Sequence, residues 1–180
     1  MLAINNKILI STPRYSQKQN FVILIHKHDS FGSLGLSLNC TLPHDFLLNL
    51  VDSLDIPYFD PNLNTQAHYG GTHDLNQGTI LHSSDYKTPS SIQISQDLHL
   101  TNSLSLLRKI AKNEGPKKSM IILGHTKFDA GQIEDELYEN KWLVMEPSAE
   151  LVFTDKIWDS ALSLKGLKPE SQIHNFTGHA

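Results

Sequence analysis

The sequence of 180 residues contains a single cysteine, Cys40. One thiol cannot form a disulfide within the chain, which fits a protein of a reducing compartment. No apolar run approaches the roughly 18 residues needed to span a bilayer. The N-terminus also lacks the charged-then-apolar pattern of a secretion signal. These absences predict a cytoplasmic protein that does not associate with membranes.

Arginine is scarce, since Arg14 and Arg108 are the only two arginines in the chain. In total 15 basic residues stand against 19 acidic ones, which gives a net charge of −4. A nucleic-acid binder normally carries a basic stripe, and the sequence shows neither such a stripe nor a helix-turn-helix pattern. We therefore expect no direct binding of nucleic acid.

The motifs of metal and nucleophilic catalysis are absent as well. The sequence has no HExxH, no CxxC, no Gly-x-Ser-x-Gly and no phosphate-binding loop. It has 10 histidines, and His26 and His28 would share one face of a strand where a metal could bind. No carboxylate accompanies them at ligand spacing, so we expect no metal and no cofactor. Cys40 is interpreted as a small apolar residue, and no catalytic residue is assigned.

The hydrophobic content of 39% and the length suit one globular domain, residues 1–180. Apolar periodicity predicts strands at residues 4–11, 21–27, 33–39, 67–69, 79–83, 91–95, 120–123 and 149–154. Helices are expected at residues 43–54, after a cap at residue 101 or 102, from residue 129 onward, and at 155–164. Residues 58–66 are expected to form a mobile loop. Because several strands are adjacent in sequence, we predict an α/β fold of the mixed α+β kind: a mixed β-sheet with several helices packed on it, in a single compact unit.

Two glycine-centred stretches stand out, residues 68–82 and 123–143. Each joins an apolar strand-like run to glycines and then to polar or imidazole side chains, as happens where backbone approaches a site or a tight packing contact. If the sheet brings these strand ends together, they form a polar cleft with backbone donors. The residues expected to line this ligand-binding cleft are Asn39, Gly70, Gly71, His82, Gly124, His125 and Gln132.

The order and spacing of these stretches resemble the bacterial AlgH/YqgE family over nearly the whole chain. The residues that carry the resemblance are 9–13, 21–28, Gly32, Gly35, Asn39, 69–71, 78–82, Gly124, 131–134, Glu136, Asn140, 142–143 and 178–180. The resemblance implies a mixed α/β structure. It does not indicate any particular enzymatic activity, since the family has no established one. The family name reflects a proposed regulatory link to alginate synthesis.

The chain departs from the family pattern inside the same stretches. Thr72 stands where proline is usual, and Gln77 stands where arginine is usual. Residues 124–128 read Gly-His-Thr-Lys-Phe in place of Gly-Tyr-Ala-Gly-Trp, and residues 39–41 read Asn-Cys-Thr in place of Asn-Lys-Pro. A shared fold is therefore a firmer expectation than a shared ligand.

The sequence as a whole favours a regulatory protein that binds a small molecule or a protein partner. One alternative is a histidine-assisted hydrolase, for which candidate side chains exist without an assembled constellation. A second alternative is a transcriptional regulator that acts indirectly, through a partner or a metabolite.

Overall fold

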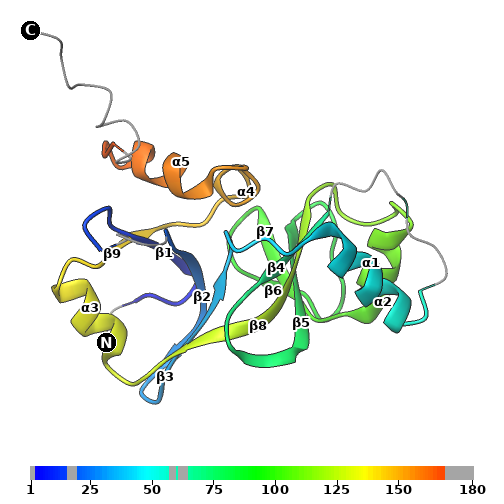
Figure 1. The fold of residues 1–180 in the computed structure, drawn as a ribbon, viewed down its shortest axis with the longest axis horizontal. Coiled ribbons are helices and arrows are strands. Elements are labelled where there is room, and N and C mark those ends of the chain that lie inside the picture. The colour runs from blue at the N-terminus through cyan, green and yellow to red at the C-terminus, as the bar shows by residue number, and fades with distance from the viewer. Residues whose placement is uncertain (1–2, 16–19, 57–59, 61–64, 169–180) are drawn as a thin grey trace, which may run out of the picture.

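The computed structural model describes residues 3–15, 20–56, 60 and 65–168, and its strands form one strongly curved sheet (Figure 1). The order across the sheet is β6-β7-β5-β8-β3-β2-β1-β9, and β4 pairs with β8 outside this path. The strands are β1 Lys7–Ser11, β2 Val22–Asp29, β3 Gly32–Ser37, β4 Gln66–Tyr69, β5 His73–Ser83, β6 Ile92–Gln93, β7 Leu98–Thr101, β8 Ser119–Phe128 and β9 Trp142–Met145.

Strand β8 holds the two halves of the sheet together. Its C-terminal end pairs antiparallel with β3, and its N-terminal end pairs parallel with β4 and antiparallel with β5. Figure 1 shows β8 running between the part that contains β1, β2, β3 and β9 and the part that contains β4 to β7. The predicted mixed sheet is therefore confirmed, with β4–β8 as a parallel pair in a mostly antiparallel ladder.

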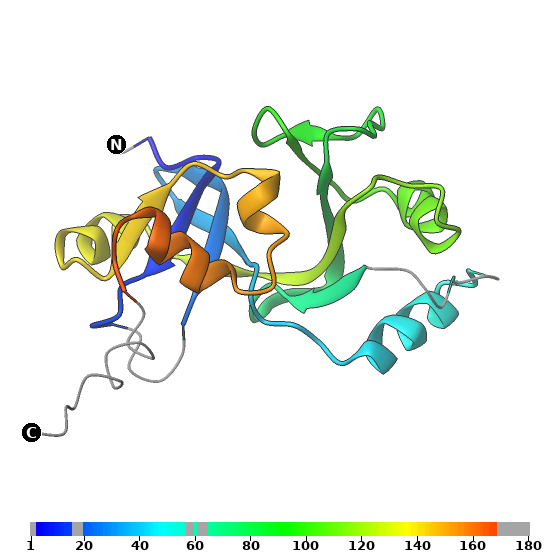
Figure 2. The same ribbon diagram turned by 90° about the horizontal axis from the view of Figure 1, so that it is seen from above.

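Helices cover the sheet at three places. They are α1 His44–Ser53, α2 Leu104–Ala111, α3 Gln132–Tyr138, α4 Ala149–Val152 and α5 Ile157–Leu164. Figure 2 shows α1 and α2 at one end of the molecule and α3 at the other. None of the helices in the described part of the chain combines the length and hydropathy that a membrane-spanning segment requires.

Strand β1 shows how alternation builds the core. Ile8 and Ile10 belong to the apolar cluster under α4 and α5, whereas Leu9 belongs to the cluster that contains Ile133 of α3 and Trp142. All three side chains of β1 are completely buried. A third cluster packs α1 and α2 against β4, β5 and β8. The sheet is thus covered on both faces around β1 and β2.

Several local expectations need correction. Residues 149–154 were predicted as a strand, but they contain α4, because the Ser148 side chain accepts a hydrogen bond from the Leu151 N–H and caps a helical turn. The cap of α2 is Ser103 rather than residue 101 or 102. Strands β7 and β9 were not predicted, and β8 continues past the glycine at which a strand end was expected. The loop expected at residues 58–66 falls mostly outside the described residues.

Candidate functional site

The two glycine stretches cross each other in direct backbone contact. The Gly70 N–H donates to the Leu123 carbonyl at 2.8 Å, and the Gly70 carbonyl accepts from the Thr126 hydroxyl at 3.0 Å. A Cβ atom on Gly71 would lie 2.3 Å from the His125 carbonyl carbon, and one on Gly124 would lie 2.7 Å from the Gly71 carbonyl oxygen. Gly124 also has a backbone φ of +69°, a conformation that residues other than glycine rarely adopt. The glycines therefore allow close packing of backbone on backbone. The sequence had left open whether they serve a tight packing contact or a binding site.

A cavity of about 360 Å³ opens beside this crossing. We call it the aromatic pocket, because five aromatic residues line it together with small polar side chains. Its lining residues are Tyr15, Phe21, Ile23, Ser37, Cys40, Tyr69, Gly71, Thr72, Thr126, Phe128, Gln132, Glu136 and Trp142. The volume lies within the range of roughly 300–1,000 Å³ that is usual for ligand sites. β2, β4, β8, α3 and β9 all contribute to its walls.

Trp142 is the centre of the aromatic wall. Its ring makes edge-on contacts with Tyr15 at a centroid distance of 5.7 Å, and with Phe21 and Phe128 at 6.5 Å each. Such T-shaped pairs stabilise a fixed ring geometry by about 0.5–1.5 kcal/mol each beyond the apolar area they bury. The wall is thus formed before any ligand arrives.

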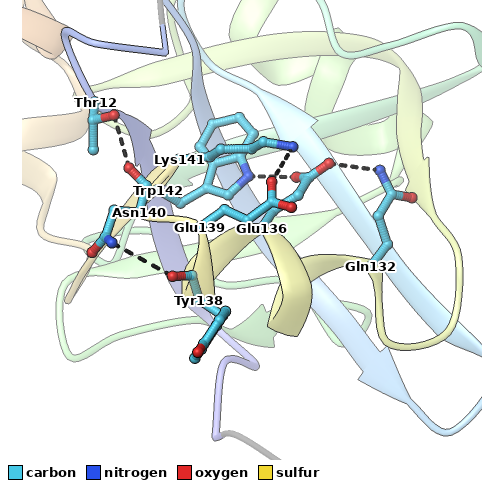
Figure 3. A network of polar contacts seen from close by, with 8 residues as sticks. All are labelled: Thr12, Gln132, Glu136, Tyr138, Glu139, Asn140, Lys141 and Trp142. Carbon is cyan, nitrogen blue, oxygen red and sulfur yellow. Dashed lines mark hydrogen bonds and ion pairs between the residues drawn. The ribbon is translucent and has the colours of Figure 1, made fainter.

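A chain of hydrogen bonds fixes the polar side of the pocket (Figure 3). The Trp142 indole N–H donates to Glu136 Oε2 at 2.6 Å, and the Gln132 amide donates to Glu136 Oε1 at 3.0 Å. The Gln132 carbonyl oxygen in turn accepts the Asp129 N–H at 2.9 Å, a contact of the capping-box kind just before α3. Both carboxylate oxygens of Glu136 are therefore held in place, and each keeps acceptor capacity for one more donor.

Charges of both signs surround this carboxylate. Lys141 Nζ lies 2.6 Å from Glu139 Oε2 and 5.4 Å from the centre of the Tyr15 ring. The hydrogen bond to Glu139, with smaller contributions from the charges of Glu139 and Glu136, raises the pKa of Lys141. Two carboxylates thus face one ammonium group at this edge of the pocket.

The residues expected in one cleft are only partly brought together. Gly71 and Gln132 line the aromatic pocket, and Gly70 and Gly124 form the crossing behind it. His125 follows the alternation of β8 and points away from the pocket, because Thr126 and Phe128 point into it. The His125 ring instead stacks on His73 at 6.0 Å.

The expectation that His82 shares a cleft with His125 is wrong. His82 pairs with Ser119 at one end of β8, and His125 lies six positions further on, which is about 20 Å at 3.3 Å per residue. The His82 side chain is completely buried and stacks on His99 at 5.8 Å. Burial lowers its pKa. It is a neutral core residue rather than a residue of the pocket.

Asn39 also lies outside the aromatic pocket. Its side-chain oxygen accepts the Val22 N–H at 3.0 Å, and its amide donates to the Asn20 carbonyl at 2.8 Å. Asn39 therefore joins the end of β3 to the start of β2. The same side chain borders a different cavity, which lies against α4 and α5.

Sequence reasoning missed the aromatic lining. Phe21, Tyr69, Phe128 and Trp142 lie in or beside apolar strand runs, where an aromatic side chain is indistinguishable from an ordinary core residue. Tyr15 is still less conspicuous because it lies in a polar turn. The available signal was the spacing of Gln132, Glu136 and Trp142, whose polar groups would meet if the chain folded back after a helix.

Among the described residues, the histidines do not gather into a group of three side chains that could hold a metal ion. His28 contacts Ser33 Oγ at 2.8 Å and Glu134 Oε1 at 3.3 Å, which resembles a hydrolase triad in composition. His28 and Ser33 are nevertheless only 8% and 4% exposed. A substrate cannot reach that serine, so the arrangement is structural.

The comparisons with known proteins all indicate the same family. The sequence profile described as AlgH-like matches residues 8–170. A UPF0301 protein of Rhizobium meliloti is 35% identical over 170 residues, covering 88% of this chain and 83% of that protein. A UPF0301 protein of Jannaschia is 30% identical over 184 residues, covering 98% and 95%.

Solved structures agree with the fold. The solution structure of AlgH from Pseudomonas aeruginosa superimposes with a TM-score of 0.71 at 25% identity, over 100% of this chain and 98% of that one. A crystal structure of a Corynebacterium diphtheriae protein has a TM-score of 0.68 at 15% identity, over 91% and 88%, and shows the fold alone. The chain therefore belongs to the AlgH-like family of UPF0301 proteins.

Proposed function

We propose that this protein is a binding protein whose aromatic pocket takes a small organic cation, such as an ammonium or guanidinium compound. The observation that carries the proposal is the position of the Glu136 carboxylate at the edge of a preformed aromatic cavity. Aromatic faces attract cations through their quadrupole, most strongly when water is excluded. A carboxylate beside them supplies the opposite charge and an acceptor for the ligand's N–H groups.

The surroundings of the pocket support a cationic ligand over an anionic one. Glu136 and Glu139 carry negative charge, and Lys141 is engaged by Glu139. Lys141 Nζ already lies over the Tyr15 ring, so an aromatic ring of this pocket accepts a cation. An anionic ligand in the pocket would instead face the Glu136 carboxylate, and the described residues that line the pocket include no lysine or arginine to balance it.

The pocket also favours binding over catalysis. The polar groups on its wall are amide, hydroxyl, thiol and carboxylate groups, among which Gln132 holds Glu136, and the buried histidines His28 and His82 lie elsewhere. The cation can belong to a free small molecule or to a lysine or arginine side chain of a protein partner, since the shared chemistry is the same. The proposed setting is the cytoplasm, and the single cysteine suits a reducing compartment.

The test is a titration monitored at the two indole N–H signals in a ¹H–¹⁵N spectrum. Phenethylammonium, neutral 2-phenylethanol and anionic phenylacetate share one ring and one chain length, so they separate charge from apolar contact. We expect the Trp142 signal, assigned with Trp142→Phe, to move with phenethylammonium and to move least with phenylacetate. Glu136→Gln should weaken phenethylammonium binding by about tenfold, because a charge-assisted hydrogen bond contributes roughly 1.5–3 kcal/mol.

Glu139→Gln is the matched control, because it removes one charge from the same helix end without touching the pocket wall. It should weaken binding by less than about threefold, as expected for an exposed charge. Equal binding of the cation and the neutral alcohol would overturn the cation proposal. A Trp142 signal that no probe moves would overturn the pocket itself as a ligand site.

A further inference from the structure

A second cavity, of about 180 Å³, lies on the opposite side of β4 and β8. We call it the lysine cavity. Its floor is apolar and consists of Leu38, Met120, Val152 and Ile157. Its rim carries Lys117 and Lys118, which directly precede β8. The turn between α4 and α5 closes one wall, so the cavity lies between the sheet and the helices that cover it.

His68 is the unusual residue of this cavity. It is only 4% exposed and lines the cavity wall. A ring N–H donates to the Leu38 carbonyl, and the other ring nitrogen, Nδ1, has no hydrogen-bond partner among the described residues. A buried polar atom without a partner is costly, and next to a cavity it is a candidate contact for a ligand that enters the cavity. Less than 1 Å² of Nδ1 is accessible in this structure, so a ligand donor reaches it after a small shift of the surrounding side chains.

The direction of the His68 side chain follows from its strand. Its neighbour Ala67 packs with the apolar cluster under α1 and α2. His68 pairs with Ile122, which belongs to the cluster under α4 and α5. Alternation therefore places the imidazole ring on the α4–α5 face, where the lysine cavity lies.

The protonation of His68 decides what it can bind. Burial lowers its pKa to about 4, so the ring is neutral at neutral pH. With one ring nitrogen donating to Leu38, Nδ1 presents a lone pair and acts as an acceptor. The partner must accordingly bring a hydrogen-bond donor.

The charges of the cavity specify the rest of the ligand. Lys117 and Lys118 contribute two ammonium groups, and Asp155 contributes one carboxylate, so the rim is positive overall. Lys118 Nζ lies 6.0 Å from the centre of the Phe153 ring, which places it on the side of α4. A negative group on the ligand would therefore face the lysines while its donor reached inward to His68.

We propose that the lysine cavity binds a small hydroxycarboxylate, with the carboxylate at Lys117 and Lys118 and the hydroxyl donating to His68 Nδ1. A cavity of about 180 Å³ is smaller than the usual pocket for a drug-sized ligand, which favours an acid of only a few carbons. A simple carboxylate lacks the donor for His68, and a neutral diol lacks the charge for the lysines. This site is separate from the aromatic pocket and does not depend on its proposed function.

The experiment compares three probes that share a three-carbon skeleton: lactate, propionate and propane-1,2-diol. Binding is followed through the backbone amides of β8 and through the ¹⁵N signal of His68 Nδ1, which moves when the nitrogen accepts a hydrogen bond. We expect lactate to bind at least about tenfold more tightly than propionate, because a site built around a hydroxyl rejects the analogue that lacks it. The diol should bind least.

Variants test the carboxylate contact with the lysines and the hydroxyl contact with His68 separately. Lys118→Gln should weaken lactate binding about tenfold, whereas Lys112→Gln, at the end of α2 and away from the cavity, should leave it unchanged. His68→Phe should remove the preference for lactate over propionate. If His68→Phe does not fold, the comparison of probes on the unaltered protein still decides.

Two results would overturn the proposal. The first is equal binding of lactate and propionate with a stationary His68 Nδ1 signal, which would mean that bound water occupies the cavity. The second is the absence of any shift up to about 50 mM lactate, a concentration that detects even weak binding with a Kd of tens of millimolar.

Discussion

Buried His68 should make the stability of this protein depend on pH in a way that one substitution removes. Its pKa falls from 6.5 to about 4, mainly through burial. Between these two values the unfolded chain binds a proton that the folded chain does not. The contribution of His68 to stability is therefore fully present above pH 6.5 and is lost as the pH falls towards 4.

The size of the effect follows from the same two pKa values. Proton linkage at His68 lowers the free energy of unfolding by about 2 kcal/mol at pH 5 and about 3 kcal/mol at pH 4, relative to pH 7.5. His26, His82 and His99 also have pKa values lowered by burial, so the unaltered protein should lose more than this. Since a domain is stable by only about 5–15 kcal/mol, the loss is a large part of the total.

The assay is urea unfolding of the unaltered protein and of His68→Phe at several pH values between 7.5 and 5. Phenylalanine keeps a ring in the cavity wall but cannot take up a proton. The variant is expected to be less stable at pH 7.5, because the Leu38 carbonyl loses its donor, and to lose about 2 kcal/mol less on going to pH 5.

Ala67→Gly provides the control for general destabilisation. Ala67 is buried in the same strand, and glycine in a strand interior costs roughly 0.5–1 kcal/mol without adding or removing a titrating group. Its curve of unfolding free energy against pH should run parallel to that of the unaltered protein. Parallel curves for His68→Phe as well would refute the reasoning, because His68 would then titrate alike in the folded and unfolded states.

Three further predictions concern the backbone crossing, the pocket wall and the surface. Gly124→Ala should cost more than about 2 kcal/mol of unfolding free energy, whereas Gly131→Ala should cost about 1 kcal/mol; both have positive φ, but only at Gly124 does the new Cβ meet backbone. Equal losses in urea unfolding would contradict this. Glu136→Gln should cost about 1–2 kcal/mol and Glu139→Gln less than about 0.5 kcal/mol by the same method, because only Glu136 accepts the Trp142 indole N–H. Finally, with 15 basic and 19 acidic residues, the protein should not bind duplex DNA at physiological salt in an anisotropy titration, and tight sequence-dependent binding would disprove it.

The regular parts of the fold could be predicted because local patterns determine them. The leucine stripe of α1 and the isoleucine-rich runs of β1 and β2 carry clear periodicity. Residues 149–154 could not be assigned by pattern, because a short apolar run has no period of its own and only the Ser148 cap makes it helical. β8 was cut short because a glycine inside a strand looks like its end.

The candidate site was harder to predict because its geometry depends on strand register. Gly71 and Gln132 both lie where strands or helices end, and both line one cavity, while their ligand-binding role stays a prediction. His82 was misplaced because the sequence does not show which residue of β8 it faces. The aromatic lining comes from segments far apart in the chain, and nothing local distinguishes those rings from core residues.

The pairing of β1 with β9 has a consequence for how the chain folds as it is made. β1 is synthesised first and can pair with β2 at once, but its other edge waits for β9, and the Trp158 indole that donates to the Ser11 carbonyl comes 147 residues later. At roughly 5–20 residues per second, a ribosome takes about 7 to 30 s to cover that distance. Throughout that interval Ile8 to Ile10, completely buried in the finished protein, form an open and strongly apolar sheet edge. The first strand therefore stays without its β9 partner until the last third of the chain has been made.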